Sequence, residues 1–137
     1  MLSIFFVVFF TCVLVAHCIG DFWFQTRWMG TTKHKDILAL SAHVLTYFLT
    51  LTGCTYLLFA FYHVFNFNAT HTDRLPAFLV INAVLHLITD AITSRITAYF
   101  KSERGYSDKG FFTTIGVDQM IHSITLFISS AWCFGII

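Results

Sequence analysis

The sequence predicts an all-α integral membrane protein, a four-helix bundle with a polar interior of histidine and aspartate near the cytoplasmic side. Of its 137 residues, 57% are hydrophobic and 11% are charged, whereas soluble domains average about 25% charged residues. Four stretches are also apolar enough and long enough to cross a bilayer, which takes about 20 residues. We expect residues 1–137 to form a single transmembrane domain.

Short polar connections separate the four expected helices. No lysine or arginine precedes the first helix, so we expect this segment to be retained rather than cleaved as a signal peptide. Asp36 can cap the second helix, Pro76 suits the first turn of the third, and Gly105 and Gly110 interrupt the chain before the fourth. The expected spans are residues 2–25, 37–63, 76–100 and 112–137.

Basic residues are concentrated in the first and third connections, and only Arg74 lies in the second. Cytoplasmic loops of membrane proteins carry an excess of lysine and arginine. We therefore expect a multi-pass protein of the inner (cytoplasmic) membrane, with the basic loops in the cytoplasm and both termini outside. The residues that support this orientation are Arg27, Lys33, Lys35, Arg95, Lys101, Arg104 and Lys109.

Seven side chains that can bind metal ions lie inside the expected spans. Six of them form pairs spaced i,i+4, so each pair shares one helical face. Because the helices alternate in direction, all seven fall in one layer, roughly 9–20 Å from the cytoplasmic edge at 1.5 Å per residue. No lysine or arginine is expected within this layer; Arg95 is the nearest. The seven are His17, Asp21, His43, His86, Asp90, Asp118 and His122.

An aspartate near the centre of a spanning helix costs about 2.5–3.5 kcal/mol, so these carboxylates need a compensating partner. Imidazoles and carboxylates suit zinc, manganese or iron. Seven such groups exceed the needs of one tetrahedral site, so we expect all seven to bind one or two divalent ions. His43 is a further ligand or the general base, while Gln25 and Gln119 orient water or substrate. A hydrogen-bonded network with protonated or shared carboxylates is the alternative.

Four short motifs carry these residues: H-C-I-G-D-F-W-F-Q-T-R-W-M (His17–Met29), A-H-V-L-T-Y (Ala42–Tyr47), H-L-I-T-D (His86–Asp90) and D-Q-M-I-H (Asp118–His122). Together they resemble a family of small bacterial and phage membrane proteins of unknown function, with the pattern H-x3-D-F-x2-Q followed by later His and D-Q-x2-H motifs. The resemblance extends over essentially the whole chain and implies the four-helix membrane architecture. A looser similarity to membrane-bound metal-dependent hydrolases suggests hydrolysis by analogy.

The leading functional hypothesis is a metal-dependent hydrolase that acts on a lipid or lipid-linked phosphoester from the cytoplasmic side. An anionic head group could be received by Lys33, Lys35, Lys101, Arg104 and Lys109, although setting the topology is the simpler role for these charges. A metal-ion or proton transporter or channel is the first alternative; it would need polar stripes that continue to the outer end, where they fade. The second is a non-catalytic accessory protein held together by a structural metal or a His–Asp network. A net charge of +1 without a basic run excludes nucleic-acid binding, and the oligomeric state stays open.

Overall fold

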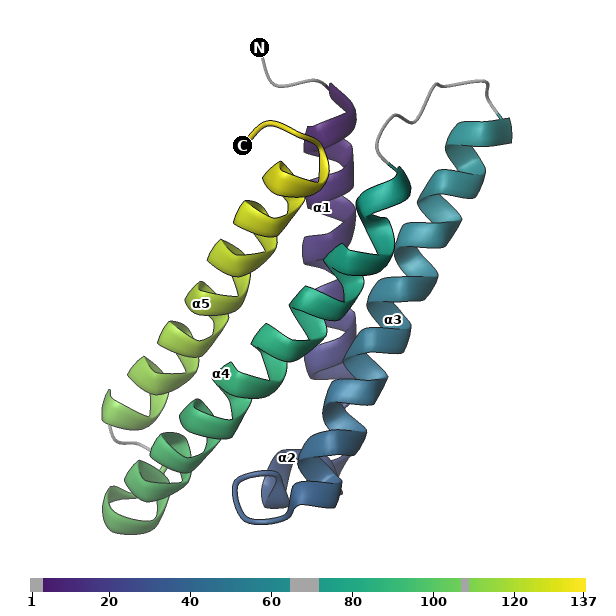
Figure 1. The fold of residues 1–137 in the computed structure, drawn as a ribbon. Coiled ribbons are helices and arrows are strands. Elements are labelled where there is room, and N and C mark those ends of the chain that lie inside the picture. The colour runs from purple at the N-terminus through teal and green to yellow at the C-terminus, as the bar shows by residue number, and fades with distance from the viewer. Residues whose placement is uncertain (1–3, 65–71, 107–108) are drawn as a thin grey trace.

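The computed structural model describes residues 4–64, 72–106 and 109–137, which form helices and turns without a strand (Figure 1). In chain order the elements are α1 (Ile4–Cys18), the π-helical turn η1 (Ile19–Trp23), α2 (Arg27–Thr32), α3 (Ile37–Val64), the 3-10 turn η2 (Thr72–Arg74), α4 (Leu75–Arg104) and α5 (Lys109–Cys133). Four helices, with α1 and η1 counted as one, are long and apolar enough to cross a membrane. The all-α, four-span membrane architecture is confirmed.

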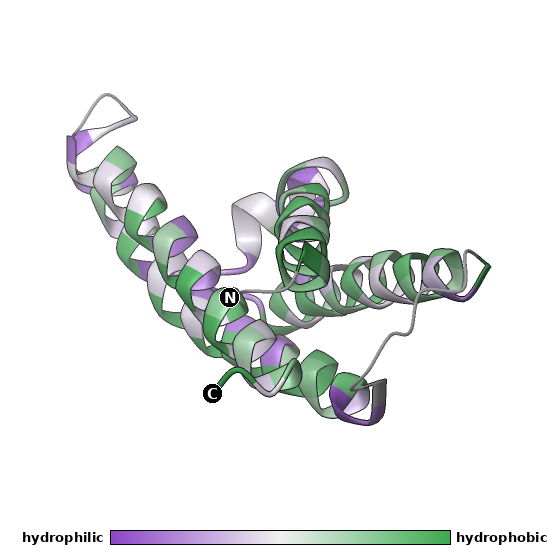
Figure 2. Ribbon diagram, turned by 90° about the horizontal axis from the view of Figure 1, so that it is seen from above, coloured by the Kyte–Doolittle hydropathy of each residue, from purple (hydrophilic) through white to green (hydrophobic). Residues whose placement is uncertain are grey.

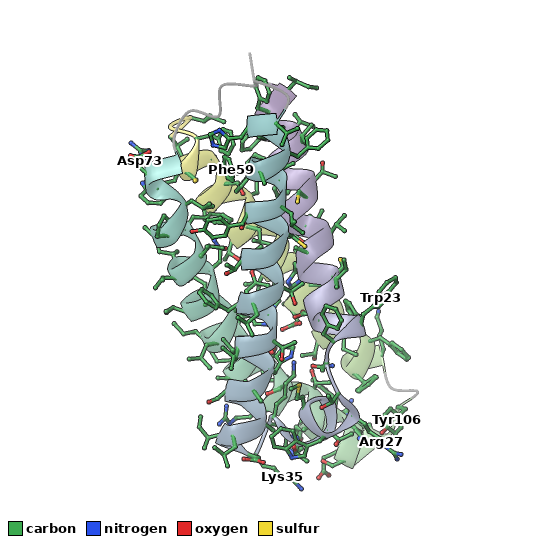
Figure 3. The ribbon with its side chains drawn as sticks, turned by 90° about the vertical axis from the view of Figure 1, so that its right-hand side faces the viewer. Trp23, Arg27, Lys35, Phe59, Asp73 and Tyr106 are labelled. Carbon is green, nitrogen blue, oxygen red and sulfur yellow. The ribbon has the colours of Figure 1, made fainter. Side chains whose placement is uncertain are left out.

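The four long helices close into a bundle. Helix α4 packs along α5 and α3, and α1 packs against α3 and α5, so each helix contacts two neighbours. The start of α1 and the end of α5 lie at one end of the bundle, and the short helix α2 lies at the other (Figure 1). Phe59 and Asp73 mark the first end, while Arg27, Lys35 and Tyr106 mark the second (Figure 3). We call the second end the basic end.

The outer surface of the bundle is apolar. Hydrophobic residues dominate the four long helices (Figure 2), and large apolar side chains are exposed on every one of them, for example Val15, Leu57, Val84 and Ile128. In water, exposed apolar surface costs about 25 cal/mol per Å². Such a surface is compatible with contact to the hydrocarbon of a lipid bilayer.

Aromatic side chains fill the interior of the end opposite to the basic end. The ring of Phe9 lies 5.3 Å from that of Phe78, 4.9 Å from that of Phe134 and 6.0 Å from that of Phe59, centroid to centroid. Phe9 and Phe78 are fully buried. Packed rings at these separations leave a closed apolar core in this half of the bundle.

Two local features of the fold were not predicted. The first span ends in a π turn, in which the Phe24 N–H donates to the Ile19 carbonyl over a distance of 3.0 Å. After it, the Thr26 hydroxyl caps helix α2 by accepting from the Met29 N–H, and α2 packs against α3. The chain therefore folds back under the bundle instead of running straight from the first span into the second.

Candidate metal centre

The seven metal-capable residues meet between the helices in the half of the bundle nearer the basic end. His17 lies on α1, Asp21 on η1 and His43 on α3, while α4 and α5 contribute two residues each. Asp118 has a side chain that is 15% exposed, and the other six residues are at most 5% exposed. The donor atoms form three overlapping groups of three residues, and the atoms within each group lie within 4.8 Å of one another. The cluster could therefore hold a metal ion.

Five separations among four donor atoms of this cluster are comparable with those between the ligands of a metal ion. The Nε2 atoms of His43 and His86 lie 3.1 Å apart, and Asp21 Oδ1 lies 3.5 and 3.2 Å from them. Asp90 Oδ2 lies 2.8 Å from the first nitrogen and 3.7 Å from the second. Tetrahedral zinc, with ligands at about 2.0–2.1 Å, has ligand–ligand edges of about 3.3–3.4 Å. The observed separations bracket this value.

Asp21 Oδ1 supports this comparison. The atom is buried, and two imidazole nitrogens lie within 3.5 Å of it. A buried carboxylate oxygen needs a compensating partner. Its lone pair and those of the facing imidazoles suit a cation shared among them.

A second group of donors adjoins the first. His122 Nε2 lies 3.3 Å from Asp90 Oδ1 and 3.5 Å from Asp118 Oδ1, and His17 Nε2 lies 3.5 Å from Asp21 Oδ2. Asp21 and Asp90 thus direct one oxygen toward each group. Carboxylates placed between two sets of ligands are suited to sites that hold two metal ions.

The imidazoles of the cluster make their polar contacts through Nε2. The Nδ1 atoms of His17, His43 and His86 have no hydrogen-bond partner among the described residues. Packing therefore orients these rings, most directly at His86, where the Tyr47 ring stacks at a centroid distance of 3.9 Å and an angle of 5°. Both rings are buried in the core.

The two glutamines singled out in the sequence have different surroundings. The Gln119 side chain accepts from His17 Nε2 at 3.2 Å and donates to Asp21 Oδ2 at 3.2 Å and to Asp118 Oδ2 at 3.1 Å. Asp118 also accepts from the Thr93 hydroxyl at 2.5 Å, a contact that the sequence did not predict. Gln25 lies beside Gly30 and makes no hydrogen bond to the cluster among the described residues.

The expectation that no lysine or arginine reaches this layer is wrong. Lys33 Nζ lies 2.7 Å from Asp90 Oδ2 and forms an ion pair with it. The expectation failed because helix α2, which packs against α3, was not predicted in the first connection. In the structure α2 and the turn after it carry Lys33 back under the bundle, and its long side chain reaches inward.

A cavity of about 370 Å³ connects the cluster with the basic end. At its inner end lie Asp21, Asp90, Asp118 and Gln119, and further along the wall lie Gln25, Lys33, His34, Lys101 and Tyr106. The exposed Tyr106 side chain belongs to the basic end (Figure 3). His17, His43, His86 and His122 are not part of the cavity wall. Small molecules that enter from the basic end therefore meet the carboxylates first.

A family model described as "Protein of unknown function (DUF3307)" matches residues 9–136. This range includes every residue of the cluster and nearly all of the four spans. The chain belongs to the DUF3307 family. No curated protein and no solved structure matches it.

Membership in DUF3307 confirms the resemblance to an uncharacterised family that the sequence motifs indicated. The family description names no activity, and neither hydrolysis nor transport follows from it. The argument for a function of this DUF3307 protein therefore depends on the geometry of its buried cluster and cavity.

Proposed function

We propose that this protein is a membrane-embedded, metal-dependent hydrolase that acts on a lipid or lipid-linked phosphoester. One observation carries the proposal: seven nitrogen and oxygen donors form a buried cluster at the inner end of a cavity. A metal site that is accessible at one side only is typical of catalysis, whereas structural sites are closed. In this proposal the metal ligands are His17, Asp21, His43, His86, Asp90, Asp118 and His122.

The charge of the cluster supports a bound divalent cation. Three aspartates and the Lys33 ammonium leave two negative charges when the imidazoles are neutral. An uncompensated charge is energetically costly in the interior of a protein, and it is also costly within a membrane. One zinc, manganese or iron ion would neutralise the cluster, and a second would require protonation changes or movement of Lys33.

The surroundings of each residue suggest its role. His43 is fully buried and away from the cavity wall, which favours a ligand over a general base. Asp118 and Gln119 lie on the wall and are held in place by hydrogen bonds, so they are suited to position the attacking water. Gln25 lies on the same wall and is suited to contact substrate. A bound divalent ion would act as a Lewis acid toward the phosphoryl oxygen and the water.

The filled half of the bundle favours a hydrolase over a transporter or channel. Beyond the cluster, Asn82 Nδ2 donates to Ser129 Oγ at 2.9 Å, and both side chains are buried. Past this pair the interior consists of the packed rings around Phe9 and Phe78. An ion moving toward that end would have to displace tightly packed aromatic groups. We therefore propose that the cavity is a dead-ended pocket entered from the basic end.

Release of phosphate tests the proposed activity. Purified protein in mild detergent, loaded separately with Zn²⁺, Mn²⁺ or Fe²⁺, is incubated with phosphatidic acid or farnesyl diphosphate. We expect metal-dependent phosphate release by the wild type and its loss in Asp118→Asn. Asp73→Asn serves as the matched control, because Asp73 is exposed at the opposite end (Figure 3). Absence of hydrolysis with all three metals, in protein that has bound them, would contradict the proposal.

A further inference from the structure

Lys33 holds a central carboxylate of the cluster and also lines the cavity. Its ammonium lies 2.7 Å from Asp90 Oδ2, and its side chain is 17% exposed, against 2% for Asp90. Within the described part of the chain, no other lysine or arginine forms an ion pair with an aspartate of the cluster. Lys33 therefore stands at the boundary between the buried donors and the open cavity.

The carboxylate oxygen that Lys33 holds is also a donor that a metal ion would use. Asp90 Oδ2 lies 2.8 Å from His43 Nε2, and Asp90 forms with His43 and His86 one of the groups that could hold a metal ion. A divalent ion and an ammonium that share one oxygen repel each other, and burial strengthens this repulsion. Lysine has a flexible four-carbon stem. Metal binding at Asp90 would thus direct the Lys33 ammonium into the cavity.

The cavity beyond Lys33 suits an anionic group. Lys101 and His34 lie on its wall, and burial together with the positive charges of Lys35, Lys101 and Arg95 lowers the pKa of His34 below its usual range. Positively charged side chains bind phosphoryl oxygens in proteins.

The same cavity has an apolar side. Phe22 comes from η1 and Phe111 and Ile115 come from α5, and Phe22 is exposed on the outer surface of the bundle. A ligand with a charged head and an apolar tail would match both sides, because most of a small-molecule site is apolar with a few polar groups that fix the orientation. A wholly polar phosphate would leave the apolar wall unused.

We propose that Lys33 exchanges partners: it releases Asp90 when a metal ion binds there and then binds the phosphoryl group of an amphiphilic ligand, with Lys101 supporting that group from further along the cavity. This inference rests on the proposed function, since it names the residues that recognise the substrate of the same site. It makes opposite predictions for two ligands. Removing the ammonium should strengthen metal binding and weaken phosphoryl binding.

The experiment measures both affinities in one set of variants. Mn²⁺ affinity is measured by electron paramagnetic resonance in detergent, and lipid binding to Mn²⁺-loaded protein by native mass spectrometry with phosphatidic acid and with phosphatidylcholine of the same chains. For Lys33→Gln we expect Mn²⁺ to bind about tenfold more tightly and phosphatidic acid about tenfold more weakly, each factor corresponding to about 1.4 kcal/mol. Lys33→Arg should retain phosphatidic acid binding.

Two further variants make the test independent of the folding of Lys33→Gln. Arg27→Gln removes an exposed positive charge of the basic end that is not on the cavity wall (Figure 3), and it should behave like the wild type. Lys101→Gln should weaken phosphatidic acid binding and leave the affinity for Mn²⁺ near that of the wild type. Equal binding of phosphatidic acid and phosphatidylcholine, or unchanged phosphatidic acid binding in both Lys33→Gln and Lys101→Gln, would overturn the inference.

Inorganic phosphate distinguishes the two sources of the phosphoryl group. Displacement of phosphatidic acid only at a large excess of inorganic phosphate supports a lipid-linked ligand, whereas displacement at equal concentrations would overturn the amphiphile and identify a soluble phosphate. A different outcome would contradict the proposed function. A wild type that binds no metal but binds phosphatidic acid through Lys33 would refute the metal-dependent hydrolase and the exchange of partners driven by metal, and would leave only the phosphoryl site in place.

Discussion

Gly20 lies directly against Tyr47: a Cβ atom built on this glycine would be 3.3 Å from the Tyr47 Cα. The close approach brings the π turn that carries Asp21 against helix α3, and the Tyr47 ring in turn stacks on His86. Asp21 Oδ1 and His86 Nε2 end 3.2 Å apart as a result. One packing contact between two helices thus fixes the position of two proposed metal ligands.

Substituting Gly20 by alanine tests this contact. The added methyl group meets the Tyr47 Cα of α3, so we expect the free energy of unfolding to fall by about 1–2 kcal/mol and bound metal to fall with it. Gly53→Ala is the control, because nothing lies within 4 Å of its Cβ and alanine is favoured over glycine in a helix by about 1 kcal/mol. Thermal unfolding in detergent checks both variants. Equal stability of Gly20→Ala and Gly53→Ala would be inconsistent with a tight contact.

Tyr47 is expected to act on the site through the ring that covers His86. Tyr47→Phe keeps a flat ring and should keep the metal, whereas Tyr47→Leu removes the ring and should weaken metal binding about tenfold, the lower end of the range for groups that orient metal ligands. Elemental analysis of both variants, purified in parallel, provides the comparison. If Tyr47→Leu binds as much metal as Tyr47→Phe, the stacked ring is not what orients His86.

The sequence predicted the four spans and the meeting of the seven polar residues because both depend on periodicity. Spacings of four residues place His86 with Asp90 and Asp118 with His122 on one face, whatever the details of packing. A polar face in an apolar helix must turn inward in a membrane. The partition of the chain into spans depends only on length and hydropathy, so these features can be inferred without coordinates.

The contacts of Lys33 could not be predicted in the same way. They depend on the π turn of η1 and on the capped helix α2, two features of five and six residues that leave no periodic signal. Lys33 was correctly placed in a basic connection, but its direction depends on how that connection folds. The Thr26 side chain, three residues before Met29, is the one local signal of a helix start that could have indicated α2.

The proposed orientation is tested by labelling single cysteines. Lys35→Cys and Asp73→Cys lie at opposite ends of the bundle (Figure 3), so a membrane-impermeant thiol reagent should reach them from opposite sides. With both termini outside, as the excess of basic residues suggests, Asp73→Cys should react in intact cells and Lys35→Cys only after the membrane is opened. The unsubstituted protein controls for its native cysteines. The reverse pattern would place the cavity on the outer side.

Substituting Asp90 by asparagine distinguishes a metal centre from a hydrogen-bonded network without metal. Asn at this position keeps the shape but removes a charge and a donor for metal, so bound metal should fall by at least about tenfold. A network without metal predicts no stoichiometric metal in the wild type and no change in metal content on substitution. The metal content of Asp90→Asn is compared with that of the wild type and of Asp73→Asn. Equal metal content in all three proteins would favour the network.

The metal content of the wild-type protein tests the central claim most directly. The protein is purified in mild detergent without chelator, and its zinc, manganese and iron are measured per chain by elemental analysis. We expect one or two equivalents of a divalent transition metal, which a strong chelator removes and the same metal restores. Protein that is folded by circular dichroism, contains no stoichiometric metal and takes up none of the three on reconstitution would contradict the metal centre.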